Sequence, residues 1–196
     1  MAKHVNIDLK GKFPHELAEE DPELMRLWGE INNAWDVIER LLYVAFDAML
    51  SEETTFATQA VFYSQHSHAG RRAMVESLAK YALANRPQTA KNLKNAIKRV
   101  KARSNDRNNL AHGTWSVGVD LKTNESDIQR FALGADIIPG PKSFYSRQRL
   151  TEVRNSMRDT ANVLREAIDP IDTAKRANAS KLAAKHLEKA IPLEKP

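Results

Sequence analysis

A short polar stretch near the middle of the chain carries the residue types best suited to chemistry on a phosphate. It reads Asp106-Arg107-Asn108-Asn109-Leu110-Ala111-His112-Gly113. An arginine can hold a phosphate through two parallel hydrogen bonds and offset charge that grows on its oxygens. A histidine titrates near neutral pH and can give or take a proton. Arg107 and His112 are therefore residue types suited to chemistry on a phosphate. Asn108 lies one turn before His112, where its amide can orient the imidazole or contact the phosphate.

The spacing of these two residues sets a geometric condition. On an ideal helix, five steps of 100° leave Arg107 and His112 about 140° apart. One phosphate can meet both side chains only where the helix unwinds or where a second subunit contributes. A plainer interpretation stays open, in which both are cations that complement the negative end of a helix dipole. Asn108 and Asn109 are then only polar residues beside a loop.

The stretch resembles the motif of the HEPN family (higher eukaryotes and prokaryotes nucleotide-binding), which is an arginine, four to six residues and a histidine. The polar Asn108 after the arginine and the Leu-Ala-His-Gly ending are similar to many bacterial members. The resemblance extends loosely over residues 21–168 and includes a Trp-x-x-x-Glu element at Trp35 and Glu39. A hairpin expected after the motif departs from the minimal bundle of the family.

The resemblance implies a helical bundle that forms a homodimer and brings two motifs together. Many members cleave RNA without metal, through attack by the substrate's own 2′-hydroxyl, whereas others only bind RNA, nucleotides or proteins. It therefore implies a metal-independent endoribonuclease with the catalytic residues Arg107, Asn108 and His112. Glu39 and Asn109 are expected in support. The alternative is a non-catalytic dimeric binding module. A defence or toxin–antitoxin setting, with an antitoxin protein as partner, rests on the same analogy.

Charge is unevenly distributed and points to a polyanion. Residues 1–50 carry five basic side chains against ten acidic ones, whereas residues 86–107 carry eight basic ones against the single Asp106. Four lysines recur at steps of three and four residues and so share one helix face. They are expected to bind RNA phosphates, and the alternative is a solvated face. These lysines are Lys91, Lys94, Lys98 and Lys101.

Apolar spacing predicts an all-α fold, an antiparallel bundle of four to five core helices. Asp21-Pro22-Glu23 starts the first helix, about 40 Å long, with a seam of apolar residues three and four apart. A second helical stretch is kinked or divided at Gly70 and closed before Pro87. The motif helix runs from about Thr89 to His112-Gly113, and a last core helix is ended by Pro170. The seam comprises Leu24, Trp28, Ile31, Trp35, Ile38, Leu42, Ala45 and Met49.

Other segments complete the predicted domain plan. Residues 1–20 are a lead-in, 21–168 the helical domain, and 169–196 a basic Ala/Lys-rich tail. Strict alternation from Trp115 to Leu121, a turn at 122–125 and further apolar residues up to Leu133 predict a small β-hairpin inserted at 115–133. Glu39 is open between a plain surface acid and a salt bridge to Arg107 or the lysine-rich helix.

Composition excludes several classes of protein. With no cysteine, the chain has no disulfides, thiolate metal sites or cysteine nucleophile. His66 and His68 alone make a poor metal site, so neither metal nor cofactor is expected. No apolar run could span a bilayer and the N-terminus is polar, so we expect a cytoplasmic protein without a membrane partner. The tryptophans Trp28, Trp35 and Trp115 are expected in the core rather than stacked on bases.

Overall fold

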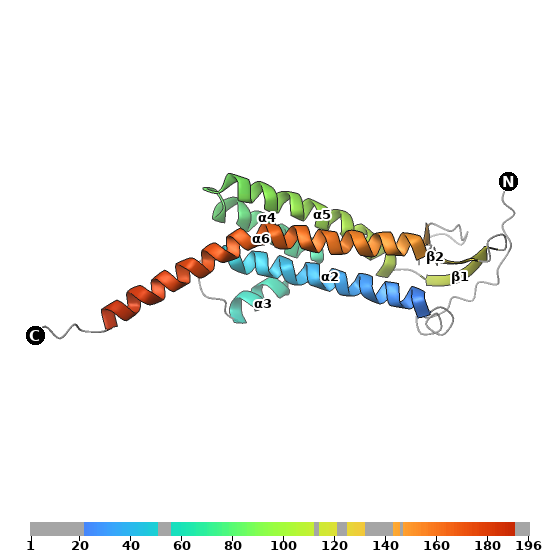
Figure 1. The fold of residues 1–196 in the computed structure, drawn as a ribbon, viewed down its shortest axis with the longest axis horizontal. Helices are drawn as coiled ribbons and strands as arrows, with labels where there is room; N and C mark the ends of the chain where they lie inside the picture. The colour runs from blue at the N-terminus through green and yellow to red at the C-terminus, as the bar shows by residue number, and fades with distance from the viewer. Residues whose placement is uncertain are drawn as a thin grey trace, which may run out of the picture. The chain divides into compact units, whose positions relative to one another are not determined.

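The structure is a computed structural model that describes residues 22–50, 56–111, 114–120, 125–131, 143–145 and 147–190. Helices α2 (Pro22–Met49), α3 (Phe56–Ser64), α4 (His68–Ala82) and α5 (Pro87–Ala111) come first. Strands β1 (Thr114–Asp120), β2 (Glu125–Phe131) and β3 (Ser143–Tyr145) follow, and helix α6 (Arg147–Ala190) comes last (Figure 1). Most described residues are helical, which confirms the predicted helical class.

The chain divides into two compact units. Unit 1 combines residues 1–35 with 102–159, and unit 2 combines residues 36–101 with 160–196. Helices α2, α5 and α6 contribute to both units, so neither unit is one continuous stretch of sequence. The predicted boundaries at residues 20 and 168 stay predictions.

Unit 1 has a core formed by its three helical segments. Leu27 and Ile31 of α2, Leu110 of α5, and Leu150 and Met157 of α6 are all buried. Glu30 on α2 lies 3.0 Å from the guanidinium of Arg154 and 3.2 Å from that of Arg158, both on α6. The hydrogen bond from Arg154 holds the pKa of Glu30 below its ordinary value, although partial burial opposes the shift. These ion pairs therefore tie α2 to α6 within the unit.

Unit 2 buries the apolar faces predicted for its helices. Leu93, Ile97 and Val100 of α5 are inaccessible or nearly so, as the spacing predicts. The short helix α3 is anchored by Phe62, whose ring packs against Phe46 of α2 at a centroid distance of 5.4 Å. The seam of α2 runs through both units and is buried from Ile31 to Met49. Trp28 departs from the prediction because it is only half-buried.

The strands form one antiparallel sheet with the order β1-β2-β3. Residues pair from Thr114 with Phe131 to Asp120 with Glu125, and Ile128 of β2 pairs with Tyr145 of β3. Sequence alternation gave no expectation for β3, which has only three residues. Of the predicted turn at 122–125, residues 122–124 lie outside the described residues, and Glu125 is the first residue of β2.

Two helix boundaries differ from the prediction. The second helical stretch is divided at residues 65–67 rather than at Gly70. Ser67 caps α4 by accepting a hydrogen bond from the amide of Gly70 at 3.0 Å, and this satisfies a donor of the first turn.

Pro170 does not end the last helix, which continues to Ala190 (Figure 1). A proline removes one intrahelical hydrogen bond and crowds the preceding turn. Tertiary contacts on the far side of Pro170 outweigh that penalty. Ile171 is buried, and Lys175 lies 2.8 Å from both the carboxylate and the backbone carbonyl oxygen of Asp47 on α2. The predicted tail is therefore helical as far as residue 190.

None of the described helices is both long and apolar enough to cross a membrane.

Candidate functional site

Arg107 lies near the end of α5, and not all of its guanidinium donors form hydrogen bonds within the described residues. Its side chain is half-buried, and its Nε is buried without a hydrogen-bond acceptor among the described residues. Its Nη1 reaches the side-chain oxygen of Asn108 only at 3.5 Å, which is a weak contact. A buried guanidinium donor that lacks an acceptor favours binding of an anion.

The acidic residue next to Arg107 is already neutralised. Arg103 lies 2.9 Å from the Oδ2 of Asp106 and donates a hydrogen bond of 2.7 Å to the hydroxyl of Ser156 on α6. Arg103 and Asp106 form an ion pair, in which Asp106 Oδ2 accepts no hydrogen bond from the described residues. No carboxylate in the described part of the chain pairs with Arg107, so its charge is available to a ligand.

The other predicted residues of the motif are placed only in part. Asn108 and Asn109 are exposed, and Asn109 makes a further polar interaction. His112 lies outside the described residues, directly after the end of α5 at Ala111. Arg107 and Asn108 are thus neighbours, while the approach of His112 to either remains a prediction.

The four lysines of α5 form one exposed face, which we call the lysine face. Their positions fall within an arc of about 80° on an ideal helix, and the buried residues of the same segment lie on another side. Among the described residues, Lys91, Lys94 and Lys98 have no acidic partner. Lys101 is equally exposed and makes one further interaction. The charges of Lys91, Lys94 and Lys98, which no described carboxylate neutralises, attract phosphates.

Glu39 is not a plain surface acid, and its two carboxylate oxygens pair with residues of α4 rather than with the predicted partners, Arg107 or the lysine-rich helix. Its predicted support of the motif stays a prediction. Its side chain is 15% exposed, and it lies between the side chains of His68 and Arg71 of α4. Its Oε1 is 2.5 Å from Nδ1 of His68, and its Oε2 is 2.9 Å from Nε of Arg71. Burial raises the pKa of Glu39, but the hydrogen bonds from His68 and Arg71 outweigh burial and hold the pKa below its ordinary value. Glu39 thus has a structural role that joins α2 to α4.

Sequence reasoning missed the partners of Glu39 because they belong to a different helix. His68 and Arg71 are three residues apart, so they share a face of α4. That spacing was the available signal, although it does not identify the opposing acid. Arg71 is held in addition by the backbone carbonyl of Gln65, at 2.8 Å.

Metal and base-stacking roles gain no support from the described residues. In the described segments no three His, Asp or Glu side chains converge as metal ligands. Trp35 is 6% exposed and belongs to the core, as predicted. The side chain of Trp115 lies outside the described residues.

Helix α5 is therefore basic, and near its end it carries the half-buried Arg107, whose Nε donor has no acceptor among the described residues. This arrangement suits an anionic polymer better than a neutral ligand.

No family model, curated protein or solved structure matches the chain.

Proposed function

We propose that the protein is a metal-independent endoribonuclease that binds RNA through the lysine face of α5 and cleaves it at the Arg107 motif. The observation that carries this proposal is the set of cationic side chains on α5 that lack an acidic partner. Three exposed lysines and Arg107 on α5 have no acidic partner among the described residues, so their charge is open to a phosphate ligand. The resemblance of residues 107–113 to the HEPN motif supplies the reaction.

In the proposed reaction the 2′-hydroxyl oxygen of RNA attacks the adjacent phosphorus. The bond from phosphorus to the 5′-oxygen breaks, and the products are a 2′,3′-cyclic phosphate and a free 5′-hydroxyl. One proton leaves the 2′-hydroxyl and one reaches the departing 5′-oxygen, and His112 is the group assigned to proton transfer. Arg107 offsets the charge that grows on the non-bridging oxygens, and its unused Nε donor supports this role.

A homodimer is part of the proposal because the five-residue spacing separates Arg107 from His112 on a regular helix. The apolar seam of α2 is buried within the chain, so the dimer would use another surface. We expect an interface with two-fold symmetry that buries more than about 1,000 Å². A cytoplasmic location and an antitoxin partner belong to the same proposal.

The test uses purified protein and total RNA in the presence of EDTA. Wild-type protein should fragment the RNA, and His112→Ala should leave it intact. Fragmentation of equal extent by the variant, or fragmentation that EDTA abolishes, would contradict the assignment.

A second candidate function is RNA binding without cleavage. The lysine face favours it, because phosphate binding needs neither His112 nor a dimer. This candidate predicts salt-dependent binding of RNA that stays full-length under every condition.

A further inference from the structure

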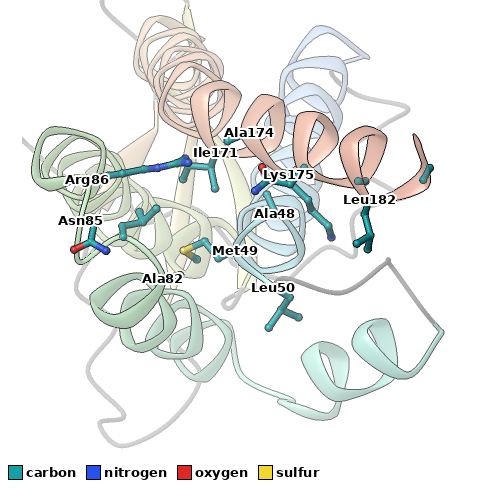
Figure 2. A pocket seen from close by; sticks show the side chains of 14 residues that line it. Ala48, Met49, Leu50, Ala82, Asn85, Arg86, Ile171, Ala174, Lys175 and Leu182 are labelled. Atoms are coloured by element: carbon teal, nitrogen blue, oxygen red, sulfur yellow. The ribbon is translucent and has the colours of Figure 1, made fainter. Parts of the chain in front are cut away.

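A groove in unit 2 lies between the end of α2, the junction of α4 with α5, and the part of α6 beyond Pro170 (Figure 2). Its volume is about 1060 Å³. Apolar side chains dominate its lining and come from all three sides: Met49, Leu50, Leu83, Ile171 and Leu182. The groove is therefore an apolar surface that three separate segments build together.

The wall formed by α6 has the pattern of a helix-binding surface. Its lining residues recur at steps of three and four and extend for about 18 Å along the helix axis. Ile171 at one end is buried, whereas Leu182 at the other end is 59% exposed. Residues 176–183 are all exposed, so this end of the apolar stripe has no cover among the residues whose burial is described. The α6 lining comprises Ile171, Ala174, Asn178, Ala179, Leu182 and Ala183, together with Lys175.

The exposed part of α6 after Lys175 would gain stability from a partner that covers its apolar stripe. Isolated helices of this length are marginal in water, and most helical stability in proteins comes from packing of an apolar face. The length of the stripe matches about three turns of a docked helix. The stripe is longer than the contact surface of a compact small molecule.

Charge around the groove selects the kind of partner. Figure 2 shows the side chain of Arg86 extended toward Ile171 of α6, across the groove. Arg86 is exposed, and no described carboxylate pairs with it. Lys175 differs because Asp47 neutralises it at 2.8 Å. A second copy that docked through the same surface would bring like charges together, whereas an acidic partner would meet complementary ones.

We propose that this groove binds an acidic amphipathic helix of a partner protein. Apolar side chains of that helix would pack on Met49, Leu83 and Leu182, and its carboxylates would face Arg86. The proposal is independent of RNA cleavage, because it uses residues of unit 2 that the proposed ribonuclease site does not include.

The test uses the full chain and a helical peptide of about 14 residues, with leucines at helical spacing on one face and glutamates on the other. A matched peptide carries lysine in place of every glutamate. Methyl NMR signals of Met49, Leu83 and Ile171 report on the groove. The acidic peptide should shift these signals on titration, and the basic peptide should bind at least about tenfold more weakly.

Exposed positions allow variants that leave the core intact. Leu182→Lys should weaken binding of the acidic peptide by about tenfold or more, whereas Ser180→Lys, outside the groove on the same helix, should not. Arg86→Glu should favour the basic peptide, and Lys80→Glu on α4 should leave the preference unchanged. Three results would overturn the proposal: unshifted groove methyls, equal binding of both peptides, or shifts that follow protein concentration without peptide. The last result would mean that a second copy occupies the groove.

Discussion

Glu39 of α2 and His68 of α4 share a short hydrogen bond, with Oε1 2.5 Å from Nδ1. An ionised carboxylate only accepts hydrogen bonds, so the Nδ1–H of His68 is the donor. Arg71, one turn further along α4, occupies the second carboxylate oxygen at 2.9 Å. The pair therefore joins two helices of unit 2 through a carboxylate that must stay charged.

We expect Glu39→Gln to destabilise the protein by about 1.5–3 kcal/mol at pH 7, because hydrogen bonds to charged groups contribute that much. The pKa of Glu39 is lower in the folded protein than in the unfolded chain. Its contribution is therefore fully present above the unfolded pKa and is lost as pH falls through the folded pKa. Urea unfolding between pH 7 and pH 3 should show a flatter acid limb for the variant.

The matched control for this experiment is Glu152→Gln, at a half-exposed acid on α6 that pairs with Arg149 at 3.3 Å. A surface pair of this kind contributes little, so the change in unfolding free energy should stay below about 1 kcal/mol. An identical pH dependence for wild type and Glu39→Gln would show that the buried carboxylate contributes no acid sensitivity.

Replacing Lys94 and Lys98 together with glutamine should weaken RNA binding at every sequence. Each lost phosphate contact removes about 0.7 from the salt slope on single strands and about 0.9 on duplex. Fluorescence anisotropy over a range of salt concentrations measures both effects. Replacing Lys80 and Lys181, which are exposed on other helices, is the control. An equal salt slope in both double variants would mean that the lysine face is only solvated and makes no phosphate contacts.

Pro170→Ala should stabilise the protein. Alanine restores the amide hydrogen that α6 lacks at this position, and a proline inside a helix costs about 3 kcal/mol. Loss of proline rigidity in the unfolded chain offsets about 0.4–1 kcal/mol of that gain. Pro170 is exposed, so no packing is lost. Thermal unfolding should show a higher Tm, and a lower one would mean that the proline fits this helix better than alanine.

Helix positions were largely predictable from the sequence, because apolar spacing reports directly on the buried face. Leu93, Ile97 and Val100 illustrate this, and so do Leu150 and Met157. Pro170 was misjudged because local propensity says nothing of the contacts that Ile171 and Lys175 make beyond it. Tertiary packing overrides a local helix-breaking signal in such a case.

The candidate site was predictable only as a list of residue types. The exposure of Lys91, Lys94 and Lys98 follows from their spacing, since it places them away from the apolar face. The partners of Glu39 did not follow, because His68 and Arg71 approach from a helix 29 and 32 residues away in sequence. Pairing across helices depends on how the helices pack, which periodicity does not specify.

A site shared between two subunits makes a distinctive prediction for mixtures of inactive variants. Arg107→Ala and His112→Ala should each be inactive alone. If Arg107 acts with the His112 of a partner, half of the dimers in an equal mixture are mixed and each has one intact site of two. The mixture should therefore recover about one quarter of wild-type activity after subunit exchange. A mixture that stays inactive, or a protein that light scattering finds monomeric at tens of micromolar, would contradict a shared site.

The most direct test of RNA cleavage is product analysis on a short RNA and on its matched analogue with one 2′-deoxy sugar at the scissile position. In EDTA, wild-type protein should cut the RNA to a 2′,3′-cyclic phosphate and a 5′-hydroxyl, and the deoxy analogue should survive. Arg107→Ala and His112→Ala should each lower the rate by about 10²–10⁴-fold, with RNA binding far less affected. Cleavage of the deoxy analogue at the same bond, or full activity in both variants, would contradict the ribonuclease mechanism.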